Sequence, residues 1–164
     1  LCFKFLAIAG RCGRRGYCRP GPNGQSAPIG SRRIDIRMAR RRVKVFFDGG
    51  SRPNPGHMEA AVVIRGVEYL FEDLGTGTNT DAEWLALLAA MEQAQSLGLA
   101  DIELIGDALA VIREANLVLN TGQATNNHAT RFLALAAKER PARVRWIKRE
   151  QNLAGICLAS RHPR

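Results

Sequence analysis

Three acidic residues, Asp48, Glu83 and Asp107, stand where a folded chain could bring their carboxylates together. Asp48 and Asp107 each follow an apolar, β-rich run, Val43–Phe47 and Ile102–Ile105 respectively. If these two strands are parallel neighbours, both carboxylates emerge at the same edge of the sheet. The helix that starts just before Glu83 would present it over that edge. Because like charges raise each other's pKa, such a cluster needs a counter-ion, and Mg²⁺ with its preference for oxygen ligands meets that need.

The chemistry of such a cluster is metal-dependent hydrolysis of a phosphodiester. Two divalent ions about 4 Å apart can clamp the attacking water and the leaving oxygen of the phosphodiester. The reaction would then require no covalent nucleophile from the protein. Mg²⁺ is the expected cofactor, and Mn²⁺ is a possible substitute.

Each acid also has an ordinary structural role that stays open. Asp48 is followed by Gly49, and Asp-Gly is a common turn signal. Glu83 completes a T-x-x-E capping box with Thr80, and Asp107 could cap the next helix. Taken singly, each acid favours its structural role, whereas the three together favour a cation site.

The surrounding sequence predicts the elements that would position these acids. The order is β-β-β-α-β-α-α-β-α, which indicates an α/β fold with a mixed sheet, antiparallel first and parallel afterwards. Besides the two strands named above, the pattern predicts a hairpin of strands 60–65 and 67–74 around Gly66, helices over 80–97, 108–119 and 129–139, a fifth strand over 143–147, and a short helix over 154–160.

Four segments resemble the motifs of the ribonuclease H family, in the same order and at similar spacing. They are VKVFFDGGSRPNPG, TGTNTDAEWLALLAAMEQA, DIELIGDALAVI and VRWIKREQNLAGICLA. The resemblance covers residues 43–160. It implies a ribonuclease H-like fold, a five-stranded mixed sheet flanked by helices, and endonucleolytic cleavage of the RNA strand of RNA–DNA hybrids.

The resemblance also implies roles for individual residues. Asp48, Glu83 and Asp107 match the family's metal-binding and catalytic acids. Asn54, Thr78 and Asn79 match positions that contact the hybrid backbone and the ribose 2′-hydroxyls. Contacts to the 2′-hydroxyls are how a protein distinguishes RNA from DNA. We add three residues to the predicted nucleic-acid-binding set, Gly49, Lys148 and Arg149. The basic residues around 138–149 could contact phosphates, or could only keep an edge strand from pairing.

The chain departs from the family pattern in its last motif. Gly155 stands where the family usually has a fourth acid, and glycine has no side chain to bind a cation. Ala108 replaces a common serine, and the loop 148–152 contains no histidine. These departures motivate an alternative, a catalytically weak or inactive ribonuclease H-like nucleic-acid-binding module. Double-stranded RNA is a further alternative substrate.

The positive charge of the chain is concentrated at its N-terminus. The net charge is +9, yet residues 1–42 hold 11 Lys/Arg against one acid, and residues 43–164 hold 13 against 14. We interpret residues 1–42 as a basic Gly/Pro/Arg-rich extension, either disordered or the product of a start placed too early, with Met38 as the alternative start. Residues 43–164 then form the ribonuclease H-like domain.

The remaining features indicate a cytoplasmic protein. The stretch 1–9 is too short to span a membrane and contains Lys4. The four cysteines form no C-x-x-C pair, which favours reduced thiols over zinc or a redox pair. We expect a monomer whose partner is an RNA–DNA hybrid, with no membrane association and no organic cofactor.

Overall fold

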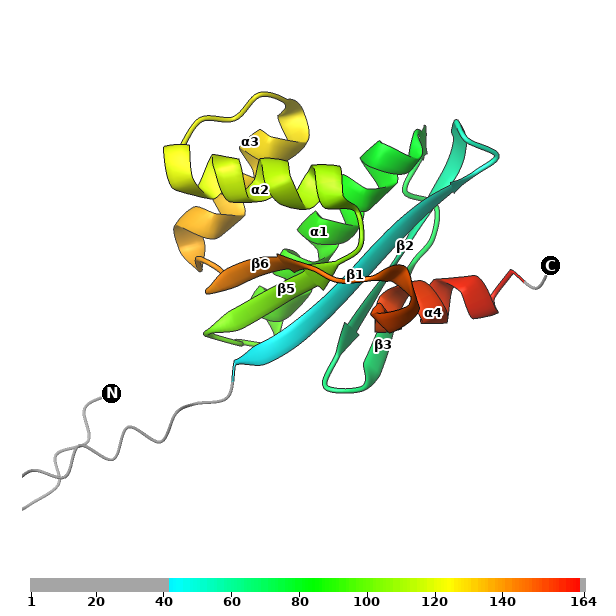
Figure 1. The fold of residues 1–164 in the computed structure, drawn as a ribbon, viewed down its shortest axis with the longest axis horizontal. Helices are drawn as coiled ribbons and strands as arrows, with labels where there is room; N and C mark the ends of the chain where they lie inside the picture. The colour runs from blue at the N-terminus through cyan, green and yellow to red at the C-terminus, as the bar shows by residue number, and fades with distance from the viewer. Residues whose placement is uncertain (1–41, 163–164) are drawn as a thin grey trace, which may run out of the picture. The chain divides into compact units, whose positions relative to one another are not determined.

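The computed structural model describes residues 42–162. The interpretation of residues 1–41 as a disordered or misassigned extension lies outside this part of the chain. Within it, the predicted mixed sheet flanked by helices is confirmed (Figure 1). None of the described helices has the length and apolar character needed to cross a bilayer.

The sheet has five main strands in the order β3-β2-β1-β5-β6. β1 pairs antiparallel with β2, β2 antiparallel with β3, β1 parallel with β5, and β5 parallel with β6. A two-residue strand that the sequence did not predict, β4, pairs with the start of β2. The strands are β1 (Val43–Arg52), β2 (Gly56–Ile64), β3 (Val67–Phe71), β4 (Thr76–Gly77), β5 (Ile102–Gly106) and β6 (Arg143–Trp146).

Helices cover both faces of the sheet (Figure 1). α1 lies against β1 and β2 on one face, where α3 packs on α1 and α2 packs on α3, whereas α4 lies against β1 and β2 on the other face. The helices are α1 (Asn79–Ser96), α2 (Leu109–Thr121), α3 (Asn127–Lys138), the 3-10 turn η1 (Arg149–Gln151) and α4 (Leu153–Ser160).

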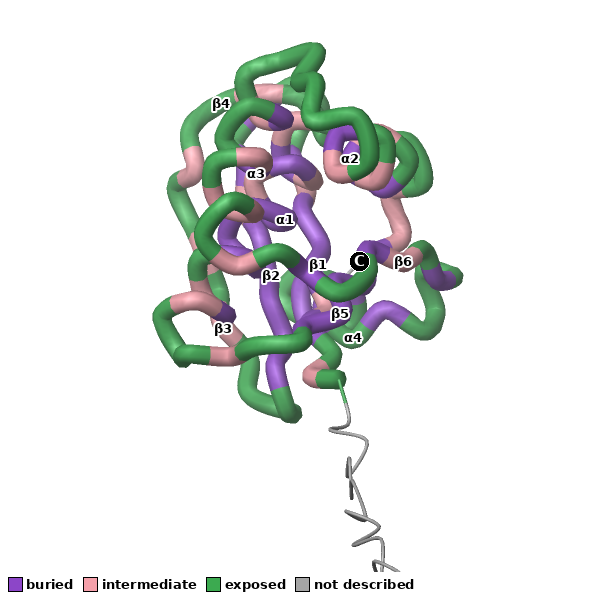
Figure 2. The backbone as a smooth tube through the Cα atoms, turned by 90° about the vertical axis from the view of Figure 1, so that its left-hand side faces the viewer, coloured by how far each residue is buried: buried purple, intermediate pink, exposed green. Residues whose placement is uncertain are grey.

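The larger apolar core fills the space between the sheet and the three-helix layer. Alternate residues of β1, such as Val45 and Phe47, point into it, as strand geometry requires. α1 is buried on most of its circumference because the sheet, α2 and α3 surround it. Figure 2 shows this burial concentrated in β1, β2, β5 and α1. The central elements that carry the three acids are therefore the most firmly packed.

The position of Asp48 differs from the prediction. The sequence suggested that the first strand ends at Phe47, but β1 continues to Arg52, and Asp48 pairs with Ala61 of β2. The prediction of a turn at Asp48 and Gly49 is therefore wrong. The parallel pairing of β1 with β5 ends at Phe46, so Asp48 lies just past the point where β5 leaves the ladder.

The start of α1 also differs from the prediction. The N-cap is Thr78, whose side chain accepts a hydrogen bond from the backbone of Asp81, while Asp81 accepts one from the backbone of Thr78. The prediction of a capping box formed by Thr80 and Glu83 is therefore wrong. Asp81 performs the capping, which leaves the Glu83 carboxylate free of that role.

Gly49 allows β1 and α1 to approach each other closely. A Cβ atom at Gly49 would lie 2.2 Å from the carbonyl oxygen of Ala82 and 2.8 Å from the backbone nitrogen of Glu83. Both are backbone atoms near the start of α1 and cannot move alone. The glycine therefore sets the distance at which Glu83 stands above Asp48.

We predict that Gly49→Ala lowers the free energy of unfolding by about 2 kcal/mol, because the added methyl group pushes the first turn of α1 away from β1. Gly50→Ala is the matched control, since a Cβ there meets only the side chain of Leu158 at 3.7 Å. Urea unfolding of both variants measures the difference. Equal stability of the two variants would contradict this account of Gly49.

Candidate active site

The three predicted acids meet at one edge of the sheet. Asp48 comes from β1, Glu83 from the beginning of the second turn of α1, and Asp107 from the residue directly after β5. One carboxylate oxygen from each lies within 4.8 Å of the others. Asp48 is buried, and Glu83 and Asp107 are half-buried. The alternative role of Asp107 as a helix cap is wrong, since the N-cap of α2 is Ala108 and has no side-chain hydrogen bond.

Burial and mutual repulsion make these acids hard to ionise. Burial, together with a hydrogen bond to Asp107 and its charge, raises the pKa of Asp48 from 3.8 to about 7. Burial, followed by the charges of Asp48 and Asp107, raises the pKa of Glu83 from 4.5 to about 9. The positive charge of Arg149 opposes both shifts. Ionising all three acids together therefore requires positive charge beyond what the described protein groups supply.

The donor set fits a hard divalent cation. The Oε2 atom of Glu83 is buried and has no hydrogen-bond partner among the described residues, which is costly for a carboxylate oxygen unless a cation completes its environment. Mg²⁺ and Mn²⁺ both accept such all-oxygen ligands.

Asn152 holds the cluster in place. Its side chain is fully buried, and its Nδ2 atom donates to the carbonyl oxygen of Phe47 at 3.0 Å and to Asp107 Oδ1 at 2.9 Å. Both partners are acceptors, which fixes the orientation of the amide. Whether Asn152 reaches the site could not be decided from the sequence. It does so by linking the start of α4 to β1 and to Asp107.

Two of the residues predicted to contact nucleic acid, Asn54 and Asn79, form a hydrogen-bonded frame with Ser51 beside the acids. The backbone N–H of Asn79 donates to Asn54 Oδ1 at 3.1 Å, and Asn79 Oδ1 accepts from the backbone N–H of Ser51 at 2.8 Å. The buried Ser51 hydroxyl lies within hydrogen-bond distance of the carbonyls of Pro53 and Gly77. The structure therefore brings Asn54 and Asn79 together and adds Ser51, which the sequence analysis missed.

A small polar pocket of about 170 Å³ opens next to this frame. It is lined by Gly49, Gly50, Ser51, Arg52, Asn79, Glu83 and Arg149. Lys148, which was predicted to contact nucleic acid beside Arg149, is exposed and does not line the pocket. Arg52 was not predicted as a site residue.

Other basic residues near the last strand have structural partners. Arg145 Nε lies 2.9 Å from Glu103 Oε1, Arg143 Nε lies 3.9 Å from the same atom, and Arg140 donates to the carbonyl of Leu119. These contacts favour the structural interpretation for that part of the basic stretch.

His128 and the two tryptophans complete the surroundings of α1. His128 is half-buried; its ring stacks on buried Trp84, and its Nε2 atom lies 3.3 Å from Asp81 Oδ1. These contacts dock the first turn of α3 on the start of α1. Trp84 is buried in the core, whereas Trp146 is 43% exposed and donates its indole N–H to the carbonyl of Asp107.

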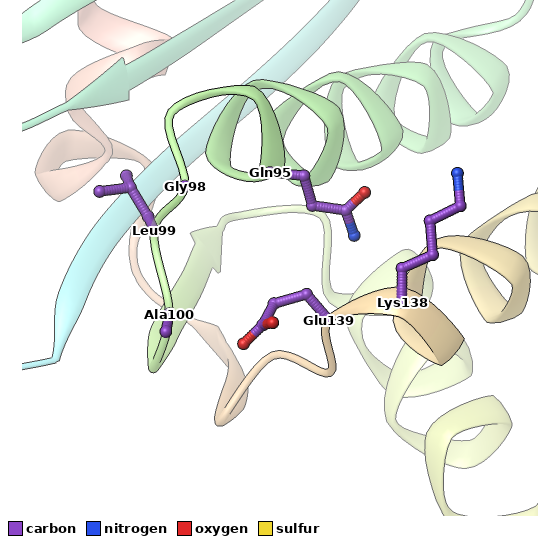
Figure 3. A pocket seen from close by; sticks show the side chains of 6 residues that line it. All are labelled: Gln95, Gly98, Leu99, Ala100, Lys138 and Glu139. Atoms are coloured by element: carbon purple, nitrogen blue, oxygen red, sulfur yellow. The ribbon is translucent and has the colours of Figure 1, made fainter. Parts of the chain in front are cut away.

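A larger hollow lies between the C-terminal ends of α1 and α3. It has a volume of about 300 Å³, and Figure 3 shows the residues that line it, Gln95, Gly98, Leu99, Ala100, Lys138 and Glu139. None of them belongs to the acid cluster or to the frame. This hollow is therefore no part of the candidate active site.

Comparison with known proteins assigns the family. The profile of the family described as reverse transcriptase-like, which has the ribonuclease H-like fold, matches residues 46–162. The chain belongs to the ribonuclease H-like family. Ribonuclease HI of Halobacterium salinarum is 41% identical over 78 residues, which are 44% of this chain and 39% of that protein. The aligned segment thus spans about two-fifths of that relative's length.

Solved structures of this family superpose on the chain. The crystal structure of RNase H1 from Halobacterium salinarum is 30% identical, with a TM-score of 0.61, and the match covers 71% of this chain and 93% of that chain. LC11-RNase H1, isolated from compost, was crystallised in complex with an RNA/DNA hybrid. It is 26% identical, with a TM-score of 0.57, and the match covers 68% of this chain and 89% of that chain.

The departure from the family pattern at Gly155 falls directly on the site. A Cβ atom built at Gly155 would lie 3.4 Å from Cγ of Asp48 and 3.5 Å from each of its carboxylate oxygens. These are ordinary contact distances, so a side chain at this position would start beside Asp48. The fourth acid expected by analogy with the family is therefore absent at the place where it would face the cluster.

We predict that the metal-free protein becomes less stable as pH rises from about 5 to 9. The raised pKa values of Asp48 and Glu83 mean that both groups favour the fold fully when protonated, and that this contribution is lost as pH rises toward about 7 and 9. Asp48→Asn and Glu83→Gln should raise the stability at about pH 8 by more than about 1 kcal/mol. Thermal unfolding in EDTA across this pH range measures it.

Glu92→Gln is the control, because Glu92 is an exposed residue of the same helix and pairs with Arg131 at the surface. Its pH profile should match that of the unchanged protein. Mg²⁺ should raise the melting temperature more at about pH 8.5 than at about pH 6, since the cation binds the ionised acids. Identical pH profiles for Glu83→Gln and Glu92→Gln would contradict the electrostatic description of the site.

Proposed function

We propose that the protein is a divalent-metal-dependent endonuclease that hydrolyses the RNA strand of RNA–DNA hybrids. The observation that carries the proposal is the meeting of Asp48, Glu83 and Asp107 within 4.8 Å at the sheet edge, beside the frame of Asn54 and Asn79. The relative LC11-RNase H1, crystallised with an RNA/DNA hybrid, supports this substrate class. We propose a monomer that acts in the cytoplasm without an organic cofactor.

In this proposal the three acids hold the cation, for which Mg²⁺ is our first choice and Mn²⁺ the substitute. A bound divalent ion of this kind acts as a Lewis acid and lowers the pKa of a bound water. Glu83 contributes its unpartnered Oε2 atom, and Asn152 keeps Asp107 oriented toward the cluster. Water attacks the phosphorus, the bond to the 3′ oxygen breaks, and the products carry a 3′-hydroxyl and a 5′-phosphate.

The remaining residues select and align the substrate. Thr78 and Asn79 lie at the exposed start of α1, and Asn54 lies beside them through its hydrogen bond to the Asn79 backbone. We assign these residues to contacts with the hybrid backbone and the ribose 2′-hydroxyls, which distinguish RNA from DNA. Gly49 brings β1 close to this surface, and Lys148 and Arg149 supply positive charge for phosphates.

The test is cleavage of an end-labelled RNA–DNA hybrid by the purified protein in Mg²⁺ and in Mn²⁺. We expect cleavage of the RNA strand, a reduction of at least about 100-fold in Asp48→Asn, and little cleavage of double-stranded RNA. Asp101→Asn is the control, because Asp101 pairs with Arg42 at the surface, away from the cluster. A hybrid left uncut in both metals by the unchanged protein would contradict the proposal.

A second candidate function is a nucleic-acid-binding module with weak or no catalysis. The observation that favours it is the position of Gly155 beside Asp48, where a fourth carboxylate could otherwise stand. Such a module would bind the hybrid through the same surface but cut it slowly.

Gly155→Asp separates the two candidates. If the native site is impaired by the missing acid, we expect the rate of hybrid cleavage in Mg²⁺ to rise by at least about 10-fold. Gly155→Asn is the matched control, since it adds the same bulk without the charge. An unchanged rate in Gly155→Asp would show that another group already takes the place of the fourth acid. It would contradict the idea that the site is weakened at this position.

A further inference from the structure

The small polar pocket beside Glu83 has two arginines in its walls. Arg52 comes from the end of β1 and Arg149 from the start of η1, two elements far apart in the sequence. The lining also includes the segment Gly49–Ser51 and Asn79. Two arginines therefore line one concave space of about 170 Å³.

The charge of these arginines is largely available to a ligand. Within residues 42–162, Arg149 makes no ion pair, and Arg52 makes one, in which its Nε lies 3.8 Å from Glu59 Oε1 while 53% of its side chain is exposed. Arg149 lines the same pocket as Glu83, so its positive charge lies beside the acid cluster.

The size and the lining of the pocket select a phosphate group. Sites for drug-sized molecules usually have volumes of about 300–1,000 Å³, so this pocket suits a small anion better than a base or a nucleoside. Guanidinium groups match the oxygen geometry of phosphate and can bind it through paired hydrogen bonds.

The position of the pocket indicates which phosphate it would bind. Glu83 lines the pocket, but Asp48 and Asp107 do not. The cleaved phosphodiester must lie among all three acids, so a phosphate in this pocket would be a neighbouring one. Asn79 belongs to the surface that we assign to the ribose 2′-hydroxyls, which places the pocket along the RNA strand.

We propose that Arg52 and Arg149 bind an RNA-strand phosphodiester next to the one that is cleaved, and so set the register of the substrate in the site. This inference rests on the proposed function and deepens it. It assigns Arg52 a role in binding and gives Arg149 a specific target in place of a general attraction to nucleic acid.

The first test is hybrid binding in EDTA, in which no cleavage interferes. Arg149→Gln and Arg52→Gln should each weaken binding by about 10-fold, since each loses charge-assisted hydrogen bonds to one phosphate. Arg65→Gln is the charge-matched control, because Arg65 lies in the β2–β3 turn at the opposite end of β2, and it should change binding by less than about 2-fold. Unchanged melting temperatures confirm that the variants are folded.

The second test moves a single neutral methylphosphonate along the RNA strand of a hybrid with one defined cut site. At one linkage adjacent to that site, the neutral group should weaken binding of the unchanged protein by about 10-fold and cause no further loss in Arg149→Gln. The proposal would be overturned if the methylphosphonate weakened binding by Arg149→Gln as much as binding by the unchanged protein at every linkage. It would also be overturned if Arg149→Gln bound the unmodified hybrid as tightly as Arg65→Gln does.

Different results would contradict the proposed function and the phosphate-binding role of Arg52 and Arg149. An unchanged protein that neither binds nor cuts the hybrid overturns the proposed function and this inference with it. An unchanged protein that cuts the hybrid, with Arg52→Gln and Arg149→Gln matching the control, overturns only the phosphate-binding role of the two arginines.

Discussion

Repulsion among three carboxylates is the constraint on which the rest of the structure depends. Asp48, Glu83 and Asp107 lie within 4.8 Å of one another at a largely buried sheet edge, where water solvates them poorly. Like charges at this separation oppose ionisation, and burial opposes it further. The arrangement persists because the surrounding core fixes the three backbones, and not because the acids attract one another.

The contacts that fix the backbones are also those that shape the site. The close approach of Gly49 to Ala82 sets the height of Glu83 above β1, and Asn152 ties α4 to β1 and Asp107. The Thr78–Asp81 cap starts α1 one turn before Glu83, so the carboxylate is left for the cluster. Stability of the fold and preorganisation of the cation ligands therefore arise from the same few interactions.

The sequence was sufficient for the fold and the acid cluster because both depend on patterns along the chain. Apolar runs followed by Asp48 and Asp107 predicted two neighbouring strands, and the structure confirms that they are parallel. The continuation of β1 past Asp48 was not predictable from that run, because pairing with β2 alone sustains it. The prediction misplaced the N-cap of α1 because two local patterns, Thr80 with Glu83 and Thr78 with Asp81, fit a capping box equally well. Tertiary packing decides between them.

The residues that sequence reasoning missed or could not place act over long distances in the chain. Asn152 reaches Phe47 across 105 positions, and Ser51 reaches Asn79 across 28. His128 stacks on Trp84 of another helix, 44 positions away in the sequence. An asparagine inside the last motif was the one signal that could have identified Asn152, whereas Arg52 gave none, because its pocket exists only after β1, α1 and η1 have packed.

The central claim is that the three acids form a cation site, and crystals soaked in Mn²⁺ test it most directly. Anomalous scattering locates Mn²⁺ without assumptions about its ligands. We predict a Mn²⁺ ion bound by Asp48, Glu83 and Asp107, with the Glu83 Oε2 atom among its ligands. A second ion beside Asp48 would indicate that the missing acid at Gly155 is compensated. Soaked crystals with no anomalous peak among the three carboxylates would contradict the account.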